Sequence, residues 1–426
     1  MTSKSNLIKA QAAACSLLAI TALHGAQSGS GALPEAESPQ SWTERESLFL
    51  GKLAAGPVED AGFTPLASWA GEQWSNVSGG IKDGTVWDSL FTLGFEQDLS
   101  KLAKKDGLGT IGMSLFYYAS SGDFGEYLDA KSDVSNIFSG DMFRVFEIYY
   151  SNSFESEYGT VSLRVGQLAA DEDFMGMDYS DLFLNSSFGA IPANAGMTLS
   201  NGAGAFSQYA LATLGATISY EYEGFDVILG IYNGNCGEDV SSNNGFDYSL
   251  QDAAFWYQIG YSYEIGGLAG RVAFGGNYHN GSFANYSTGG EERNFYSFYL
   301  NIQQDFIADS EGNAVLGGFV RLAYTPEDDI AEISKYIDAG INWFAPIPGR
   351  SDDVFGFGVS AAESAKGIRE AEDLIRWGVS LETTYRFQLT KSMSLQPSFQ
   401  VFFDTPNDAG EKTTAFVAGA RFEVIF

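Results

Sequence analysis

The chain has 426 residues, of which 45% are hydrophobic and 15% aromatic, and its formal net charge is -31. Because phosphate recognition depends on Lys and Arg, this acidic balance argues against nucleic acid or another polyanion as a partner. No apolar run approaches the roughly 20 residues of a membrane-spanning helix, whereas 22 Tyr and 33 Phe against only 10 Pro favour β-strands.

The amino terminus has the pattern of a secretory signal peptide. Lys4 and Lys9 precede an apolar stretch, and small residues follow it near position 26. We therefore expect residues 1–26 to be removed when the protein leaves the cytoplasm.

A short lead separates this signal from the rest of the chain. Its first part is rich in Gly, Ser, Pro and Ala, and residues 42–55 are then expected to form a short amphipathic helix. Such a helix ahead of a barrel could plug the lumen or sit at its periplasmic mouth. The expected division is a signal peptide, a lead with a short helix over 27–62, and one domain over 63–426.

From residue 63 onward the sequence alternates between apolar and polar residues, with turns between the alternating segments. Residues 375–387 are the clearest case, because Arg376, Glu382 and Arg386 alternate with apolar or aromatic side chains. A face with charges at alternate positions must contact water, so the opposite face is expected to contact lipid. About sixteen such segments predict an all-β fold, a transmembrane antiparallel β-barrel with a short N-terminal helix.

Turn lengths predict the orientation of the barrel. The turns at 222–225 and 264–268 are short and are assigned to the periplasmic side. The longer insertions at 121–140, 171–210 and 280–293 are expected to lie outside or to fold into the lumen.

The sequence offers few residues that could form a disulfide, bind a metal or act in catalysis. After the signal, Cys236 is the only thiol and His279 the only imidazole, so a disulfide is excluded and zinc or Ser-His sites lack supporting partners. His279 is interpreted as a polar loop residue near a strand end. The acidic runs at 171–173 and 327–329 are interpreted as solvated loop tips, with cation binding as the alternative. No cofactor is expected.

A barrel of this size leaves an aqueous channel, whose selectivity depends on the residues at its narrowest point. Sugars are bound by aromatic faces beside charged and amide side chains that satisfy hydroxyl groups. The candidates for such contacts on the lumenal side are Arg144, Glu147, Arg164, Trp256, Arg321 and Arg421.

These residues also have a structural interpretation. Arginine and carboxylate pairs can simply stiffen the wall and set a transverse field, and Trp256 would lie in the aromatic girdle if the register slipped by one residue. Arg144 and Glu147 are three positions apart, so both can point inward only if a β-bulge lies between them.

Several motifs occur in an order that resembles a known family, the carbohydrate-selective porins of the OprB type. They are NVSGG at 76–80, SDVSNI at 132–137, RVGQLAAD at 164–171, LFLNSSFG at 182–189, PGRSDD at 348–353, LQP at 395–397 and FVAGAR at 416–421. The resemblance covers nearly the whole mature chain.

The resemblance implies a sixteen-stranded outer-membrane channel of a Gram-negative-type bacterium, without enzymatic activity, that passes monosaccharides such as glucose and similar neutral solutes by facilitated diffusion. The family's Arg-x-x-Glu pattern falls on Arg144 and Glu147, and the Arg of the next strand falls on Arg164. Expected partners are small sugars, outer-membrane lipids and the barrel-assembly machinery, the last through the C-terminal Phe426. The apolar outer face is compatible with a homotrimer as well as a monomer.

Three alternatives remain open from the sequence. The acidic balance favours a general or cation-preferring porin without sugar selectivity. A barrel lipase would need His279 within hydrogen-bond reach of a Ser nucleophile. An adhesin or structural barrel would conduct nothing.

Overall fold

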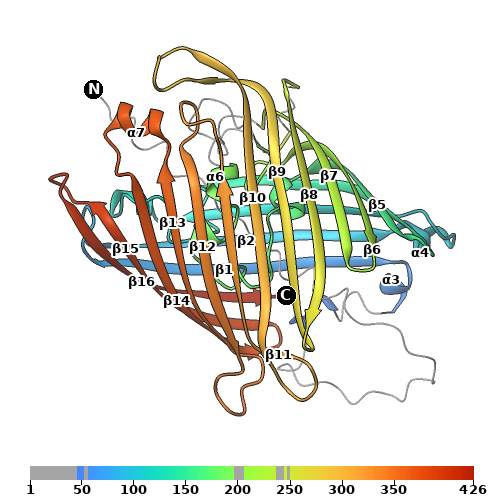
Figure 1. Cartoon of the computed structure of the whole chain (residues 1–426). Coiled ribbons are helices and arrows are strands. Elements are labelled where there is room, and N and C mark those ends of the chain that lie inside the picture. The colour runs from blue at the N-terminus through green and yellow to red at the C-terminus, as the bar shows by residue number, and fades with distance from the viewer. Residues whose placement is uncertain (1–45, 52–55, 196–205, 237–243, 247–249) are drawn as a thin grey trace.

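Sixteen antiparallel strands close into a single barrel (Figure 1). Each strand pairs with its neighbours in sequence, and β1 (Phe63–Ser78) pairs with β16 (Lys412–Ile425) to complete the ring. The computed structural model describes residues 46–51, 56–195, 206–236, 244–246 and 250–426. The strand number and the closed antiparallel arrangement predicted from the alternation are confirmed.

The remaining strands are β2 (Gly84–Asp98), β3 (Thr110–Ser120), β4 (Met142–Ser156), β5 (Gly159–Leu168), β6 (Thr213–Tyr222), β7 (Phe225–Asn233), β8 (Ala253–Ile265), β9 (Leu268–Ala284), β10 (Glu291–Ala308), β11 (Ala314–Tyr324), β12 (Ile333–Phe344), β13 (Val354–Ser364), β14 (Trp377–Thr390) and β15 (Met393–Pro406). The short helices and 3-10 turns are α3 (Pro57–Asp60), α4 (Leu99–Ala103), η3 (Phe124–Glu126), α5 (Ala170–Asp173), η4 (Ser186–Phe188), α6 (Pro192–Ala195) and α7 (Lys366–Glu372).

The two faces of the wall differ in the way the alternation predicts. In β8, Phe255, Ile259 and Tyr261 are exposed on the outer face, whereas Ala254 and Trp256 are buried on the inner face. The outer face therefore presents an apolar and aromatic band, as a wall surrounded by lipid requires. In the part of the chain that the structure describes, no helix is long and apolar enough to cross a bilayer.

The two ends of the barrel carry different connections. The two-residue turns after β6 and β8 lie at one end, the short-turn end, together with the start of β1 and the end of β16. The long connections after β3, β5 and β7 lie at the other, the long-loop end. Leu48 donates its backbone N–H to Ile425 O at 3.0 Å, and the rings of Phe49 and Phe426 are 5.6 Å apart, so residues 48–49 lie at the short-turn end.

Two expectations for the amino terminus fall largely on residues that the structure does not describe. The signal peptide over 1–26 lies outside the described residues, as do 42–45 and 52–55 of the helix expected over 42–55. In the described part of that helix, residues 46–49 form bends and only 50–51 are helical, so the expected helix is wrong over 46–49. The signal peptide and the remainder of the helix stay predictions.

One of the three long insertions is not a loop. Residues 280–293 continue β9 and β10 as a paired hairpin, with Glu291 opposite Ala284 and Glu292 opposite Phe283. Only 285–290 form the connection, and this hairpin stands above its neighbours in Figure 1. Alternation persists through the hairpin, because Phe283 and Phe295 are buried while the residues beside them contact water.

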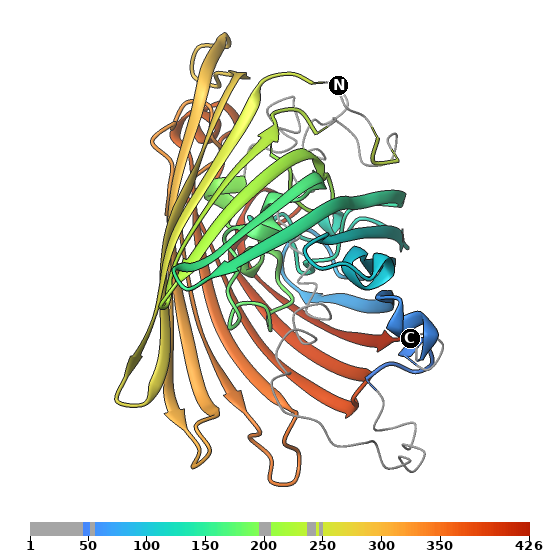
Figure 2. The same ribbon diagram turned by 90° about the vertical axis from the view of Figure 1, so that its right-hand side faces the viewer.

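The other two insertions fold into the barrel. The β3–β4 loop (121–141) and the described parts of the β5–β6 loop (169–195 and 206–212) lie inside the curve of the wall in Figure 2. Their apolar side chains form a core against the inner face. Phe174, Ile191 and Phe206 of the β5–β6 loop, for example, pack in one cluster with Trp256 and Tyr299. The apolar core of this protein therefore lies between the loops and the wall.

Candidate functional site in the barrel lumen

The β5–β6 loop crosses the lumen and is fastened to the opposite wall. Side-chain amides on the wall donate hydrogen bonds to backbone carbonyl groups of the loop, which fixes its path without depending on its side chains. These bonds join Asn301 to Met175 O (2.9 Å), Asn342 to Tyr179 O (2.9 Å) and Gln396 to Leu182 O (2.6 Å).

A buried carboxylate holds the middle of the same loop. Glu382 of β14 accepts hydrogen bonds from the backbone N–H groups of Leu184 (3.0 Å) and Asn185 (2.9 Å), and from the Ser398 hydroxyl (2.9 Å). Charge-assisted bonds of this kind are about twice as strong as neutral ones. The loop is thus attached to the far side of the barrel from the strands that it connects.

Arg321 is an anchor of this loop and does not line the channel. It is completely buried, pairs with Asp338 at 2.5 Å, and donates to the backbone oxygens of Gly189 (2.7 Å) and Ser187 (3.0 Å). Tyr336 donates to Ser187 O (2.6 Å) and to Asp338 (2.8 Å). The inward orientation expected for Arg321 is correct, but a solute contact is wrong because the loop covers the guanidinium.

Arg421 plays the corresponding part for the β3–β4 loop. Its guanidinium donates to Glu72 of β1 and to the side-chain oxygen of Asn136 in that loop. Trp74 donates its indole N–H to the same Glu72 at 2.7 Å. Because Arg421 is almost fully buried, its proposed role as a pore-lining residue is also corrected to that of an anchor.

Arg144 and Glu147 both face inward, and a β-bulge separates them. Met113 pairs with Ile148 and Leu115 pairs with Val145, so two residues of β4 lie opposite the single Ser114. This is the irregularity that the spacing of Arg144 and Glu147 required. Both side chains are buried against the interior of the barrel.

Arg164 is the predicted candidate that reaches water in the lumen. Its side chain is 23% exposed and lies between two carboxylates, Asp173 of α5 at 2.7 Å and Glu147 of β4 at 3.1 Å. Its guanidinium also stacks over the ring of Tyr149, 4.4 Å from the ring centre, and Tyr149 donates to Glu96 at 2.8 Å. We call Glu96, Glu147, Tyr149, Arg164 and Asp173 the Arg164 cluster.

A second water-exposed pair was not identified from the sequence. Arg271 of β9 and Asp226 of β7 form a two-point ion pair with distances of 2.5 and 2.9 Å, and both side chains remain partly exposed on the inner face. The alternation of each strand places both residues on the inner face, Arg271 with Ala273 and Asp226 with Gly230. In β9, however, Gly270 and Gly275 weaken the alternation, so the inward position of Arg271 is hard to recognise from the sequence.

Trp256 faces inward, so the girdle position considered for it is wrong. Its ring is buried between Phe174 and Phe206 of the β5–β6 loop, at 5.6 Å from each. Trp256 therefore supports the loop from below and does not offer its face to a solute.

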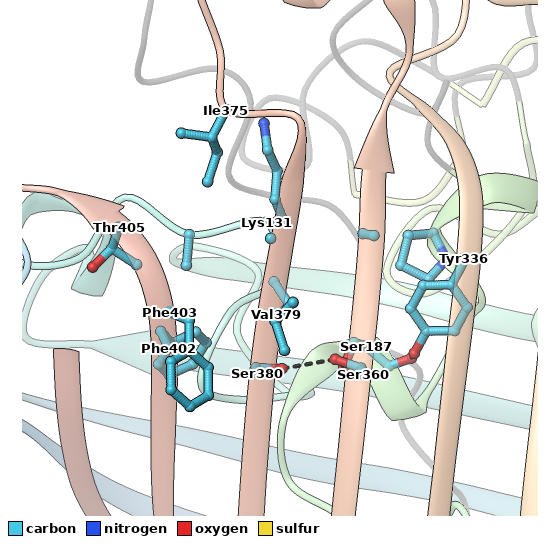
Figure 3. Close-up of a pocket in the computed structure, with 15 residues that line it drawn as sticks. Lys131, Ser187, Tyr336, Ser360, Ile375, Val379, Ser380, Phe402, Phe403 and Thr405 are labelled. Carbon is cyan, nitrogen blue, oxygen red and sulfur yellow. Dashed lines mark hydrogen bonds between the residues drawn. The ribbon is translucent and has the colours of Figure 1, made fainter. Parts of the chain in front are cut away.

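A pocket remains between the loops and the wall near the long-loop end (Figure 3). Lys131 lies on one side of it, Ser187 and Tyr336 on another, and the Ser360 and Ser380 hydroxyls are 2.7 Å apart in its wall. The Ser187 hydroxyl donates to Ser360 at 2.9 Å and Tyr336 donates to Ser187 O at 2.6 Å, so the hydroxyl groups of the pocket already bond within the protein. The pocket lies behind the loops, away from the Arg164 cluster.

The acidic run at 171–173 does not form a solvated loop tip, because it lies within the lumen. Burial raises the pKa of Asp171 to about 7, and it raises the pKa of Glu172 well above its usual value. Burial also raises the pKa of Asp181, further along the loop, to about 7. In the other run, by contrast, Asp328 and Asp329 lie exposed in the β11–β12 connection, as expected.

His279 is also corrected. It lies within β9, buried, and not in a loop. Its Nδ1 accepts from Gly281 N–H at 2.9 Å, so Nε2 carries the proton and donates to Gly234 O at 2.9 Å. Both ring nitrogens of His279 bond to backbone groups, so His279 is a structural residue. It is not available as the general base that the lipase hypothesis requires.

Comparisons with known proteins agree with this fold. The family model for "Carbohydrate-selective porin, OprB family" matches residues 88–426. The high-pH structure of Pseudomonas putida OprB is similar at 17% identity with a TM-score of 0.80, covering 91% of this chain and 100% of that one. Its low-pH structure is similar at 15% identity with a TM-score of 0.60, covering 90% and 99%. A search of the curated proteins found no significant match.

Proposed function

The chain belongs to the OprB family of carbohydrate-selective porins, and from this we propose that it is a channel for facilitated diffusion of monosaccharides, such as glucose, and similar small neutral solutes. Transport through such a pore is passive, so the proposal includes no enzymatic step and no cofactor. The proposed location is the outer membrane of a Gram-negative-type bacterium, with the long-loop end outside and the short-turn end in the periplasm.

The Arg164 cluster is the observation that supports sugar selectivity. A sugar hydroxyl both donates and accepts hydrogen bonds, and here a guanidinium that is 23% exposed lies between two carboxylates that are 8% and 11% exposed. An anion would meet three carboxylates, from Glu96, Glu147 and Asp173, around one Arg164. A neutral polyol can accept hydrogen bonds from the guanidinium and donate them to the carboxylates, and it is not repelled by either charge.

We assign roles within this cluster as follows. Arg164 donates to sugar oxygens, while Glu147 and Asp173 accept from sugar hydroxyls and hold the guanidinium in place. Arg144 is buried on the inner face of β4, three residues before Glu147, and its assigned role is to support this part of the strand. Contacts of this kind replace part of the solute's hydration and remain weak enough for release.

The loops determine where this exchange takes place. Without them, a barrel of sixteen strands is wide enough for water and small solutes to pass without contact. The β5–β6 loop is anchored to β10–β15 and brings Asp173 to Arg164. In this proposal, solutes on the remaining path pass close to the cluster. Loop position therefore determines both the size and the chemistry of the opening.

A general or cation-preferring porin is the second candidate. The observation in its favour is that the lumenal end of the β5–β6 loop carries exposed Asp178 in addition to the acidic members of the Arg164 cluster. A negatively lined pore concentrates cations.

Single-channel recording in planar bilayers separates the two candidates. For the sugar porin, we expect block of the salt conductance that rises with monosaccharide concentration and is weaker for disaccharides. Arg164→Ala should weaken this block, and Arg293→Ala, an exposed hairpin residue outside the lumen, should leave it unchanged. Cation preference without any sugar block would support the general porin, and a protein without conductance would contradict both.

A further inference from the structure

Two basic side chains share one buried carboxylate on the outer face of the wall at the long-loop end. Lys335 of β12 and Arg376, which precedes β14, each pair with Glu363 of β13 at 2.6 Å. The Glu363 side chain is 4% exposed, whereas those of Lys335 and Arg376 are 52% and 65% exposed. The carboxylate of this group is therefore covered, and its two cations are exposed.

The cations retain free hydrogen-bonding capacity. Arg376 uses only Nε for Glu363, and among the described residues no acceptor contacts its two terminal nitrogens. Lys335 likewise has Glu363 as its single described partner. A guanidinium with two open N–H-bearing nitrogens beside an ammonium group matches the geometry and charge of a phosphate.

The position of this pair is unusual for the chain. Six of the seven arginines in the described strands face the lumen, and the seventh, Arg293, lies in the exposed β9–β10 hairpin; the six are Arg144, Arg164, Arg271, Arg321, Arg386 and Arg421. Lys335 instead faces outward, in a protein with a net charge of -31. Helix α7 above it carries two basic and two acidic residues and is followed by its C-cap residue Asp373, and its first turn donates to exposed Asp328. The two cations of the pair are therefore an exception in acidic surroundings.

The pair lies at the upper border of the apolar band. The strand register places Tyr324, Lys335, Glu363 and Trp377 in one row across β11 to β14. Aromatic residues of this kind mark the level of the lipid headgroups. One step further into the band on the same face, Leu322 and Ile337 are opposite each other and exposed.

From this arrangement we propose that Lys335 and Arg376 form a binding site for a phosphorylated glycolipid of the surrounding outer leaflet. The phosphate would contact the two cations, and the acyl chains would lie over the apolar band that includes Leu322 and Ile337. A soluble phosphate would use only the first contact, so the exposed apolar surface beneath the cations favours a lipid. The proposal rests on the outer-membrane location given above.

Native mass spectrometry of the purified barrel with bisphosphorylated lipid A is the test. We expect retention of the lipid to fall about tenfold in Lys335→Gln/Arg376→Gln, because each cation near an anionic headgroup contributes to binding. The matched control is Lys391→Gln, since Lys391 has the same 52% exposure and a glutamate partner but lies in the β14–β15 turn at the opposite end. Lys335→Arg should retain binding, which would show that charge at this site is required.

Three results would overturn the proposal: unchanged retention in the double variant, an equal loss in Lys391→Gln, or equal retention of dephosphorylated lipid A. Equal competition by inorganic phosphate or by phosphatidylglycerol would contradict the assignment to a glycolipid. Sugar block of the conductance, measured on the same variants, should not change. Loss of conductance in the wild-type protein would refute the proposed channel function, while phosphate-dependent lipid retention would still support this site.

Discussion

Arg321→Ala should release the β5–β6 loop from the wall and widen the channel. The side chain joins Asp338 of β12 to the backbone of Ser187 and Gly189; the contacts with Asp338 and Ser187 are buried, and the contact with Gly189 is partly buried. Removing the guanidinium leaves the Asp338 carboxylate buried without its cation. The loop must then move or admit water to solvate that charge.

The size of the effect follows from burial. Removing one partner of a buried, hydrogen-bonded ion pair costs about 3–5 kcal/mol. Since each 1.4 kcal/mol is a factor of ten, the ratio of released to packed loop should rise by a factor on the order of 10² to 10³. A loop that is displaced for about one part in a thousand of the time in the wild type would then be displaced for a large part of it.

Single-channel recording measures this directly. We expect long openings of higher conductance in Arg321→Ala, with monosaccharide block lost during them because Asp173 leaves Arg164. Arg321→Leu/Asp338→Leu is the matched variant. Replacing both charges by apolar side chains of similar volume leaves no unpaired ion, so packing of the loop and sugar block should largely return.

The reasoning would be refuted if Arg321→Ala had wild-type conductance and wild-type sugar block in a barrel with an unchanged thermal transition. A double variant as open as the single variant would also contradict it. That result would mean that the hydrogen bonds from Arg321 to the loop backbone, and not the unpaired carboxylate, determine the position of the loop.

Three further predictions concern the lumen. Arg164→Ala should weaken monosaccharide block about tenfold, since a partly exposed charge-assisted hydrogen bond contributes about 1–2 kcal/mol; titration of the block measures it, and an unchanged value would contradict the assigned role. Burial raises the pKa of Asp171 and Asp181 to about 7, so near neutral pH the packed loop binds more protons than a released loop. The packed loop is therefore stabilised at low pH, and this stabilisation is lost as the pH rises through about 7. Wide openings should accordingly become rarer from pH 8 to pH 5, and Asp171→Asn/Asp181→Asn should flatten this dependence. Asp178→Asn should reduce cation preference in reversal-potential measurements, and no change would show that this carboxylate lies away from the ion path.

The wall could be predicted from the sequence because its cause is local. A strand between lipid and water must alternate, and that period is visible in each segment separately, as in residues 375–387. The bulge in β4 was predictable for the same reason, since it follows from the spacing of Arg144 and Glu147 once both must face inward. Each of these features depends on residues that are only a few positions apart in the sequence.

The interior could not be predicted in this way, because its causes are distant in sequence. The loop sequence around Asp171 has the polar composition of a solvated loop, and only the wall residues that bind its backbone make it a buried one. Glu382 holds Leu184 and Asn185 across a separation of 198 and 197 residues. Arg321 and Arg421 were identified as lumenal residues, but their burial depends on loops whose paths the alternation does not describe.

The closed ring of strands also affects how the folded protein unfolds. Every strand has a partner on both sides, and β1 and β16 are joined by a register that runs from Ser68 opposite Ile425 to Ser78 opposite Phe416. Such a sheet has no edge at which strands can peel away one at a time. Unfolding has to open a whole ladder first, so the barrier to that opening, and not the equilibrium between folded and unfolded chains, should govern the protein's lifetime. In a detergent gel, folded and heated samples should therefore migrate as two separate bands.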